Sequence, residues 1–137
     1  MRAVLDVNVL ISATLSARGS SAATVRAWRD GGFDLIVSPK LLAELKRAFN
    51  YPKLRKVITA DESHQLVQLL EREASLAPDP DQPPPVHSRD AGDDYLLALA
   101  ASNDAVLVTQ DPDLLTLREQ YPVRPPAECL EMIRNAD

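Results

Sequence analysis

The chain begins with the run Ala3-Val4-Leu5-Asp6-Val7, in which the residues on both alternating faces are apolar apart from Asp6. Such a run is typical of a central strand in a parallel sheet, because helices on both sides of the sheet bury both faces of the strand. Asp6 lies near the C-terminal end of this expected strand. In parallel α/β sheets, functional sites form outside the carboxyl ends of the strands, so Asp6 is a candidate site residue.

Strand and helix patterns alternate along the rest of the chain. The expected elements are a helix capped by Ser20 or Ser21 and running through Trp28, a strand over 33–37, a helix from Ser38-Pro39, a helix from the Thr59/Glu62 capping box to about Ala74, a helix from Asp93, a strand over 106–108, a short helix from Pro112, a brief edge strand at Val123 and a helix from Pro126. This alternation predicts an α/β fold, a three-layer α/β/α domain with a mainly parallel central sheet.

The length favours a single domain over residues 1–137. In the segment 78–85 five of eight residues are proline, which prevents a helix or strand from running through it. We expect this segment to be a surface loop inside the domain, because too little chain follows it to form a second core.

The composition favours a soluble, cytoplasmic protein. The chain has one cysteine, Cys129, and its N-terminal apolar run is too short to span a bilayer. A formal charge of −5 argues against a protein that coats nucleic acid by bulk electrostatics, but it leaves a nuclease with an acidic site possible.

Four acidic residues lie where the local pattern predicts burial or a strand end. They are Asp6, Glu44, Asp93 and Asp111. A carboxylate in an apolar run needs a hydrogen bond, an opposite charge or a cation, and no basic residue lies in the runs around Asp6, Asp93 or Asp111. Because hard divalent cations prefer oxygen ligands, the pattern favours a Mg²⁺ or Mn²⁺ site.

Asp93 and Asp94 are alternative candidates for one of the four ligand positions. Asp93 points to the middle of the helix face that carries Leu96, Leu97 and Ala100, whereas Asp94 points about 100° away. Asp93 is therefore the better candidate ligand, and Asp94 is the second choice.

Carboxylates around one or two Mg²⁺ ions are used to hydrolyse phosphodiesters, since the metal lowers the pKa of water and stabilises the attacking and leaving oxygens. No cysteine and histidine cluster supports zinc, and no glycine-rich nucleotide motif or hydrolase serine motif is present. For His64 and His87 we favour surface positions. The residue types therefore indicate metal-dependent hydrolysis.

A short basic segment could hold a phosphate backbone. It contains Lys46, Arg47, Lys53, Arg55 and Lys56, with Tyr51 among them. A solvated helix face followed by a loop is the simpler interpretation of the same charges.

These motifs resemble those of PIN-domain nucleases. The run Asp6-Val7-Asn8-Val9-Leu10-Ile11 is similar to the family's opening D-x-N-V-L-I, and Thr109-Gln110-Asp111 is similar to its closing T-x-D. The helix from Ser38-Pro39 to Glu44 and the Asp93 helix match the elements that bear the second and third acids. The order covers nearly the whole chain and is most similar to the VapC-like toxins of toxin–antitoxin pairs.

The resemblance implies a Mg²⁺- or Mn²⁺-dependent endoribonuclease that acts on RNA, is usually homodimeric and is inhibited by an antitoxin protein. It implies that Asp6, Glu44, Asp93 and Asp111 bind the metal, and that Asn8 and Thr109 orient them. Two departures are Val7, where many relatives carry a hydroxyl residue, and Gln110, which is expected to narrow the approach to Asp111.

Two other interpretations stay open. Asp6 could simply cap a strand end, Asp93 and Asp111 could be helix N-caps, and Glu44 could be a surface residue. The chain could then be an inactive PIN module that binds RNA or a protein partner. A receiver or phosphatase domain would need a lysine near a later strand end, and the segment 106–111 has none.

Overall fold

A computed structural model describes residues 1–136. The elements in chain order are β1 (Arg2–Leu5), α1 (Val7–Leu15), α2 (Ser20–Arg29), β2 (Asp34–Val37), α3 (Pro39–Phe49), α4 (Pro52–Arg55), α5 (Ala60–Glu73), β3 (Ser75–Leu76), the 3-10 turn η1 (Ala91–Asp93), α6 (Asp94–Ser102), β4 (Val106–Val108), α7 (Pro112–Leu115), β5 (Val123–Arg124) and α8 (Pro126–Asn135).

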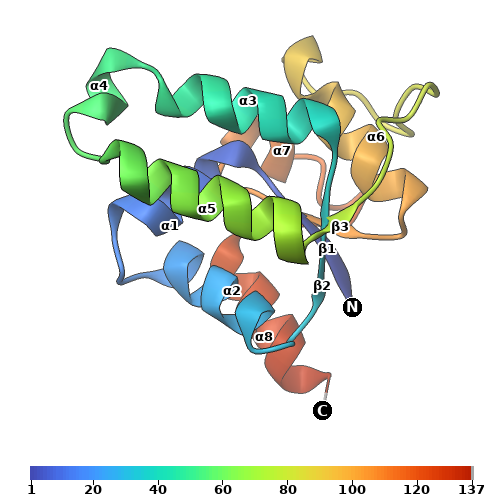
Figure 1. Ribbon diagram of the computed structural model, residues 1–137. Helices are drawn as coiled ribbons and strands as arrows, with labels where there is room; N and C mark the ends of the chain where they lie inside the picture. Colours follow the sequence, from blue (N-terminus) through green and yellow to red (C-terminus); the bar gives the residue numbers. More distant parts are fainter. Residues whose placement is uncertain (137) are drawn as a thin grey trace.

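The five strands form one all-parallel sheet in the order β3-β2-β1-β4-β5. Figure 1 shows α6 on one side of the sheet and α1, α2 and α5 on the other. This is the predicted three-layer α/β/α architecture. The central strands β1 and β4 pair Leu5 with Val108, so the residues that follow these two strands emerge side by side.

Burial follows from this layering. Val4, Leu5, Leu107 and Val108 are 0% exposed, as expected for strands that are covered on both faces. α6 contacts both central strands and buries Leu96, Leu97 and Leu99 against them. None of the helices in residues 1–136 is both long and apolar enough to span a membrane.

Several local predictions are confirmed. Ser38 caps α3, with its hydroxyl accepting from the Leu41 backbone N–H at 3.2 Å and Pro39 in the first turn. Thr59 and Glu62 form a reciprocal capping box at the start of α5. The proline-rich segment 78–85, all within the described part of the chain, runs without helix or strand.

Two predicted boundaries are wrong. The strand expected over 3–7 ends at Leu5, because Asp6 caps a helix α1 that the sequence pattern did not predict. The run Val9, Leu10 and Ile11 is buried, and its continuous apolar character hides the helical periodicity. Gly19, at φ 93°, takes the N-cap position of α2 that was expected at Ser20 or Ser21.

Candidate active site

Asp6 is a buried carboxylate at the carboxyl end of the sheet. It is 6% exposed, it directly follows β1, and its backbone N–H donates to the Val108 carbonyl of β4 at 2.9 Å. Burial raises the pKa of Asp6; hydrogen bonds from Thr109 and the Asn8 backbone oppose this effect, and the charge of Asp111 adds to it. At this buried position, an ionised Asp6 carboxylate therefore needs hydrogen-bond donors or a cation to stabilise its charge.

Thr109 connects the two acids that follow the central strands. Its side chain is 0% exposed, and its hydroxyl donates to Asp6 Oδ2 at 2.7 Å. The same hydroxyl oxygen accepts from the Asp111 backbone N–H at 3.0 Å. Asp111 also caps α7, since its Oδ1 accepts from the Asp113 backbone N–H at 2.9 Å. Asp111 thus has a structural role while it lies next to Asp6.

Asp93 adds a third charge from the start of α6. It ends the 3-10 turn η1 and occupies the N-cap position of α6 without a side-chain cap hydrogen bond. Burial raises its pKa to about 6, and the negative charges of Asp6, Asp90 and Asp111 contribute to the rise. Asp93, Asp6 and Asp111 therefore repel one another at neutral pH.

Glu44, on α3, is the fourth candidate carboxylate. It lines a cavity of about 200 Å³ together with Asp6, Asn8 and Asp93. The residues lining this cavity include no Lys, Arg or His, so no basic side chain of the described lining neutralises the carboxylates from inside. Glu44 Oε1 instead pairs with Arg47 Nη1 at 2.9 Å, and the Glu44 side chain is 34% exposed.

The donor set fits a hard divalent cation, although the carboxylates are not yet gathered around one point. Among residues 1–136 no three His, Cys, Asp or Glu side chains are close enough together to form a metal-binding group. Carboxylate oxygens are the ligands that Mg²⁺ and Mn²⁺ prefer, and a cation would offset the burial and the neighbouring negative charges that together raise the pKa of Asp93. Closing such a site would require side-chain rotation.

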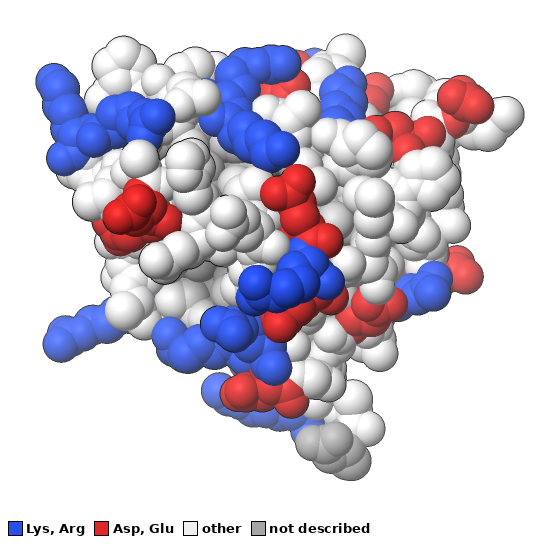
Figure 2. Space-filling model, in the orientation of Figure 1, with Lys and Arg blue, Asp and Glu red and all other residues white. Residues whose placement is uncertain are grey.

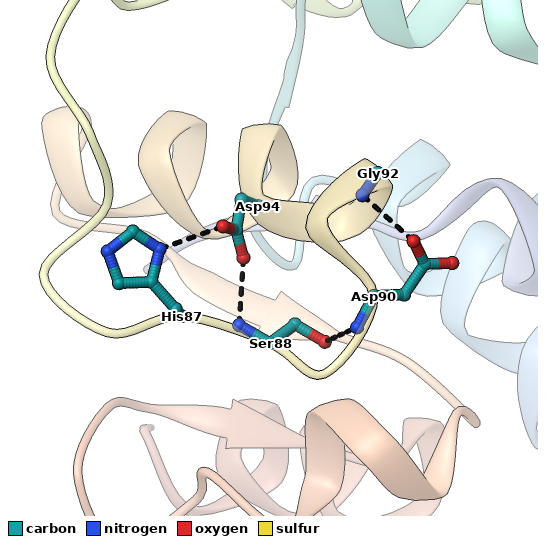
Figure 3. Close-up of polar contacts among 5 residues, drawn as sticks. All are labelled: His87, Ser88, Asp90, Gly92 and Asp94. Atoms are coloured by element: carbon teal, nitrogen blue, oxygen red, sulfur yellow. Dashed lines mark hydrogen bonds and ion pairs between the residues drawn. The ribbon is translucent and has the colours of Figure 1, made fainter.

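Asp94 is not among the residues that line this cavity. Its carboxylate instead bonds to the preceding loop, as Figure 3 shows. Its two carboxylate oxygens bond to His87 Nδ1 and to the Ser88 backbone N–H, each at 2.8 Å. Although burial opposes it, these two contacts lower the pKa of Asp94. Beside them, Asp90 Oδ1 accepts from the Gly92 backbone N–H at 2.9 Å. Asp94 and Asp90 thus hold the turn that carries Asp93.

The structure places the other predicted positions as follows. Asn8 is exposed and lines the acidic cavity, while its backbone N–H bonds to Asp6 at 3.4 Å. Val7 lines the same cavity with an apolar side chain. The side chain of Gln110 instead bonds to Ser12 on α1 and Ser21 on α2, both at 3.2 Å. The Gln110 amide therefore joins two helices.

Tyr95 is a member of the site that the sequence did not reveal. It lines the acidic cavity from α6, and Lys40 Nζ lies 4.7 Å from the centre of its ring. Burial raises the pKa of Tyr95, and the charges of Asp6, Glu44, Asp93 and Asp79 raise it further. The phenol therefore keeps its proton and remains a hydrogen-bond donor. Its position two residues after Asp93 is the only signal in the sequence.

The five basic residues of the predicted patch are all exposed on α3, on α4 and just after it. Figure 2 shows Lys and Arg side chains gathered over these two helices. Arg47 lies beside the acidic cavity through its ion pair with Glu44. Lys46 pairs with Glu71 at 3.6 Å, and Arg55 bonds to Asn50 at 3.0 Å.

A larger cavity, about 370 Å³, lies on the other side of α3, against α5. Lys46, Arg55 and His64 line it, and its single carboxylate, Glu71, pairs with Lys46. It therefore lacks the clustered carboxylates of the smaller cavity and is the weaker candidate for a metal-dependent site.

Comparison with known proteins agrees with this geometry. A family model described as "PIN domain" matches residues 2–113, a span that includes Asp6, Glu44, Asp93 and Asp111. No match was found among curated proteins.

Proposed function

The chain belongs to the PIN-domain family, whose members are generally nucleases that use divalent metals, and we propose on this basis that it is a metal-dependent endoribonuclease. Within the family we assign it to the VapC-like toxins, whose substrate is RNA. Asp6, Glu44, Asp93 and Asp111 are the proposed ligands of Mg²⁺ or Mn²⁺.

One observation carries this proposal. Three of the four carboxylates line one cavity, and the fourth, Asp111, lies close enough to contribute to the raised pKa of Asp93. A fold that gained only helix capping from these residues would have no reason to place Asp93 against Asp6, since like charges destabilise each other. A bound cation removes that cost.

The residues of the candidate site have different roles in this proposal. Asp6 and Asp111 hold fixed positions through the Thr109 hydroxyl, and Asp93 is presented by the turn that Asp94 braces. A bound Mg²⁺ or Mn²⁺ would supply Lewis-acid stabilisation of phosphate charge and a lowered pKa of water. Tyr95, which keeps its proton, offers a donor on the cavity wall.

The basic patch is the proposed path of the RNA backbone. Lys46, Arg47, Lys53, Arg55 and Lys56 are exposed on α3, on α4 and just after it, and α3 also carries Glu44 of the acidic cavity. Cations at this place can hold the phosphates that flank the one being cut, while the net charge of −5 limits binding elsewhere.

The proposal includes two partners. A small antitoxin protein would inhibit the enzyme by placing a peptide in the acidic groove, and two copies of the chain would form a homodimer. Leu15, at the end of α1, is 49% exposed and is the proposed apolar contact of that dimer near the N-terminus.

Incubation of RNA with the purified protein tests the nuclease proposal. The expected result is cutting in Mg²⁺ or Mn²⁺, none in EDTA, and loss of cutting in Asp6→Asn and Asp93→Asn. Asp104→Asn is a matched control, because Asp104 is exposed, lies outside the cavity and has a φ of 51° that asparagine tolerates.

The alternative function is an inactive PIN module that binds RNA or a protein partner. It is favoured by the lack of a closed metal-binding group among residues 1–136. A well-folded wild type that neither cuts RNA nor binds Mn²⁺ would establish this alternative and overturn the nuclease proposal.

A further inference from the structure

One aromatic side chain at the edge of the acidic cavity has no structural task. Tyr51 is 57% exposed, and it is the one exposed residue among the Phe, Trp and Tyr residues of 1–136. It lines the same cavity as Asp6, Glu44 and Asp93. A tyrosine ring that is exposed and also lines a candidate site is available to stack against a ligand there.

The backbone of Tyr51 is held firmly although its ring is free. The Tyr51 N–H donates to the Ala48 carbonyl at 3.1 Å, and the Tyr51 carbonyl accepts from the N–H groups of Leu54 and Arg55, both at 3.0 Å. Pro52 follows at the first position of α4 and restricts the local backbone further. Because the backbone of Tyr51 is already ordered, less conformational entropy is lost when its ring binds a ligand.

The charges around Tyr51 identify the kind of ligand. Carboxylates line the same cavity as Tyr51, and the exposed cations Lys53 and Lys56 follow Tyr51 on and after α4. A polyanion with flat apolar rings matches this pattern. Proteins that bind single-stranded nucleic acid use the same combination of cations for the backbone and aromatic rings for the bases.

We propose that Tyr51 stacks on an unpaired base of the substrate, next to the phosphate that is cut. This inference rests on the proposed nuclease function and adds a specificity-determining residue to it. A base inside a duplex is already stacked on its neighbours and cannot also cover Tyr51. Tyr51 therefore selects single-stranded over double-stranded RNA at the cleavage site.

Binding of a short labelled single-stranded RNA in EDTA, measured by fluorescence anisotropy, tests this role without cutting. Tyr51→Ala should weaken binding about tenfold, which is the lower half of the range for one base on one aromatic ring. Tyr51→Phe should bind as the wild type does, because stacking needs the ring and not the hydroxyl. Val57→Ala is the matched control, since Val57 is 63% exposed near the patch but does not line the acidic cavity.

An abasic scan separates stacking from a general structural effect. RNAs that each lack one base are measured with wild type and Tyr51→Ala. If Tyr51 stacks on one base, removing that base weakens wild-type binding, and the penalty of Tyr51→Ala then disappears for that RNA. The melting temperatures of the two proteins should agree, because Tyr51 is largely exposed.

Other outcomes would overturn the inference in distinguishable ways. If wild type cuts RNA but Tyr51→Ala binds every RNA equally well, the nuclease proposal stands and the stacking role is wrong. If Tyr51→Ala weakens binding equally for all abasic RNAs, Tyr51 contacts no particular base and the role is again wrong. If wild type neither binds nor cuts RNA, the proposed function fails first and this inference fails with it, which would leave a protein partner as the ligand of Tyr51.

Discussion

The hydroxyl of Thr109 donates a buried hydrogen bond to Asp6 Oδ2 at 2.7 Å, across 103 residues of sequence. Through its second contact, with the Asp111 backbone N–H at 3.0 Å, the same oxygen links the acids that follow β1 and β4. A single side chain thus sets the relative positions of two proposed metal ligands. It also satisfies a carboxylate that burial would otherwise destabilise.

Thr109→Val should therefore loosen the site while keeping the shape of the side chain. Removing the buried donor leaves Asp6 Oδ2 without this partner, which should cost about 1–3 kcal/mol of unfolding free energy. Mn²⁺ affinity should fall roughly 10- to 100-fold, as is usual when a group that orients metal ligands is lost. Denaturant melts and Mn²⁺ titrations measure the two effects. Thr109→Ser keeps the hydroxyl, and if it were as impaired as Thr109→Val, the hydrogen bond would not be the cause.

Asp93→Asn should stabilise the metal-free protein at pH 7. Folding raises the pKa of Asp93 from about 3.8 to about 6. The free energy of unfolding therefore contains a favourable contribution from protonated Asp93 that is fully present below pH 3.8 and is lost as pH rises through 6. Asparagine never ionises, so the variant should gain about 1 kcal/mol at neutral pH, after allowance for solvent screening.

The gain should vanish near pH 3.5, where both proteins carry an uncharged side chain at this position. Thermal melts in EDTA from pH 3.5 to 8 follow the difference. An Asp93→Asn variant that is less stable than the wild type at pH 7 would show that burial and the neighbouring charges do not destabilise the ionised Asp93 side chain.

Asp94→Ala should release the loop that carries Asp93. Both Asp94 oxygens bond to this loop, at His87 and Ser88. Hydrogen exchange of the Ser88 amide should become faster, and Mn²⁺ binding should weaken because Asp93 is no longer held in place. For Asp94→Asn, both the exchange rate and the Mn²⁺ affinity should lie between those of the wild type and Asp94→Ala, since the amide oxygen of asparagine can still accept from the Ser88 backbone N–H. Exchange at Ser88 that is unchanged in Asp94→Ala would remove the proposed bracing role.

Removing the cations of the basic patch should weaken RNA binding and reduce its dependence on salt. For Lys53→Ala with Lys56→Ala, the slope of log affinity against log salt should fall by about 1.4, near 0.7 for each phosphate contact to a single strand. Filter binding at several salt concentrations provides the slope. Arg134→Ala, on the exposed side of α8, should leave the slope unchanged. Equal slopes for all three proteins would remove these lysines from the RNA path.

Local chemistry explains which parts of the fold were predictable from sequence. Ser38-Pro39 and the Thr59/Glu62 pair start helices through contacts within four residues, so their patterns are visible in the chain. α1 was missed because Val9, Leu10 and Ile11 are all buried, and a helix covered on most sides loses its amphipathic signal. The short strand β3 exists only through its pairing with β2.

The placement of the candidate site residues in the fold was predictable to a similar depth. The positions of Asp6 and Asp111 after neighbouring strands followed from the parallel sheet, and Asp93 was preferred over Asp94 from helix geometry. The pairing of Glu44 with Arg47 and the approach of Tyr95 to the carboxylates were not predictable. Both depend on how α3 and α6 present their side chains, which the periodicity of one helix does not specify.

Metal binding in solution is the most direct test, because the carboxylates share a cavity without forming a closed group among residues 1–136. The measurement is the melting temperature of wild type, Asp6→Asn and Asp104→Asn with increasing Mn²⁺. A ligand that binds only the folded state must stabilise it, so wild type and Asp104→Asn should melt at rising temperatures while Asp6→Asn should not respond. Wild-type melting that is unchanged by millimolar Mn²⁺ would contradict a metal site at Asp6.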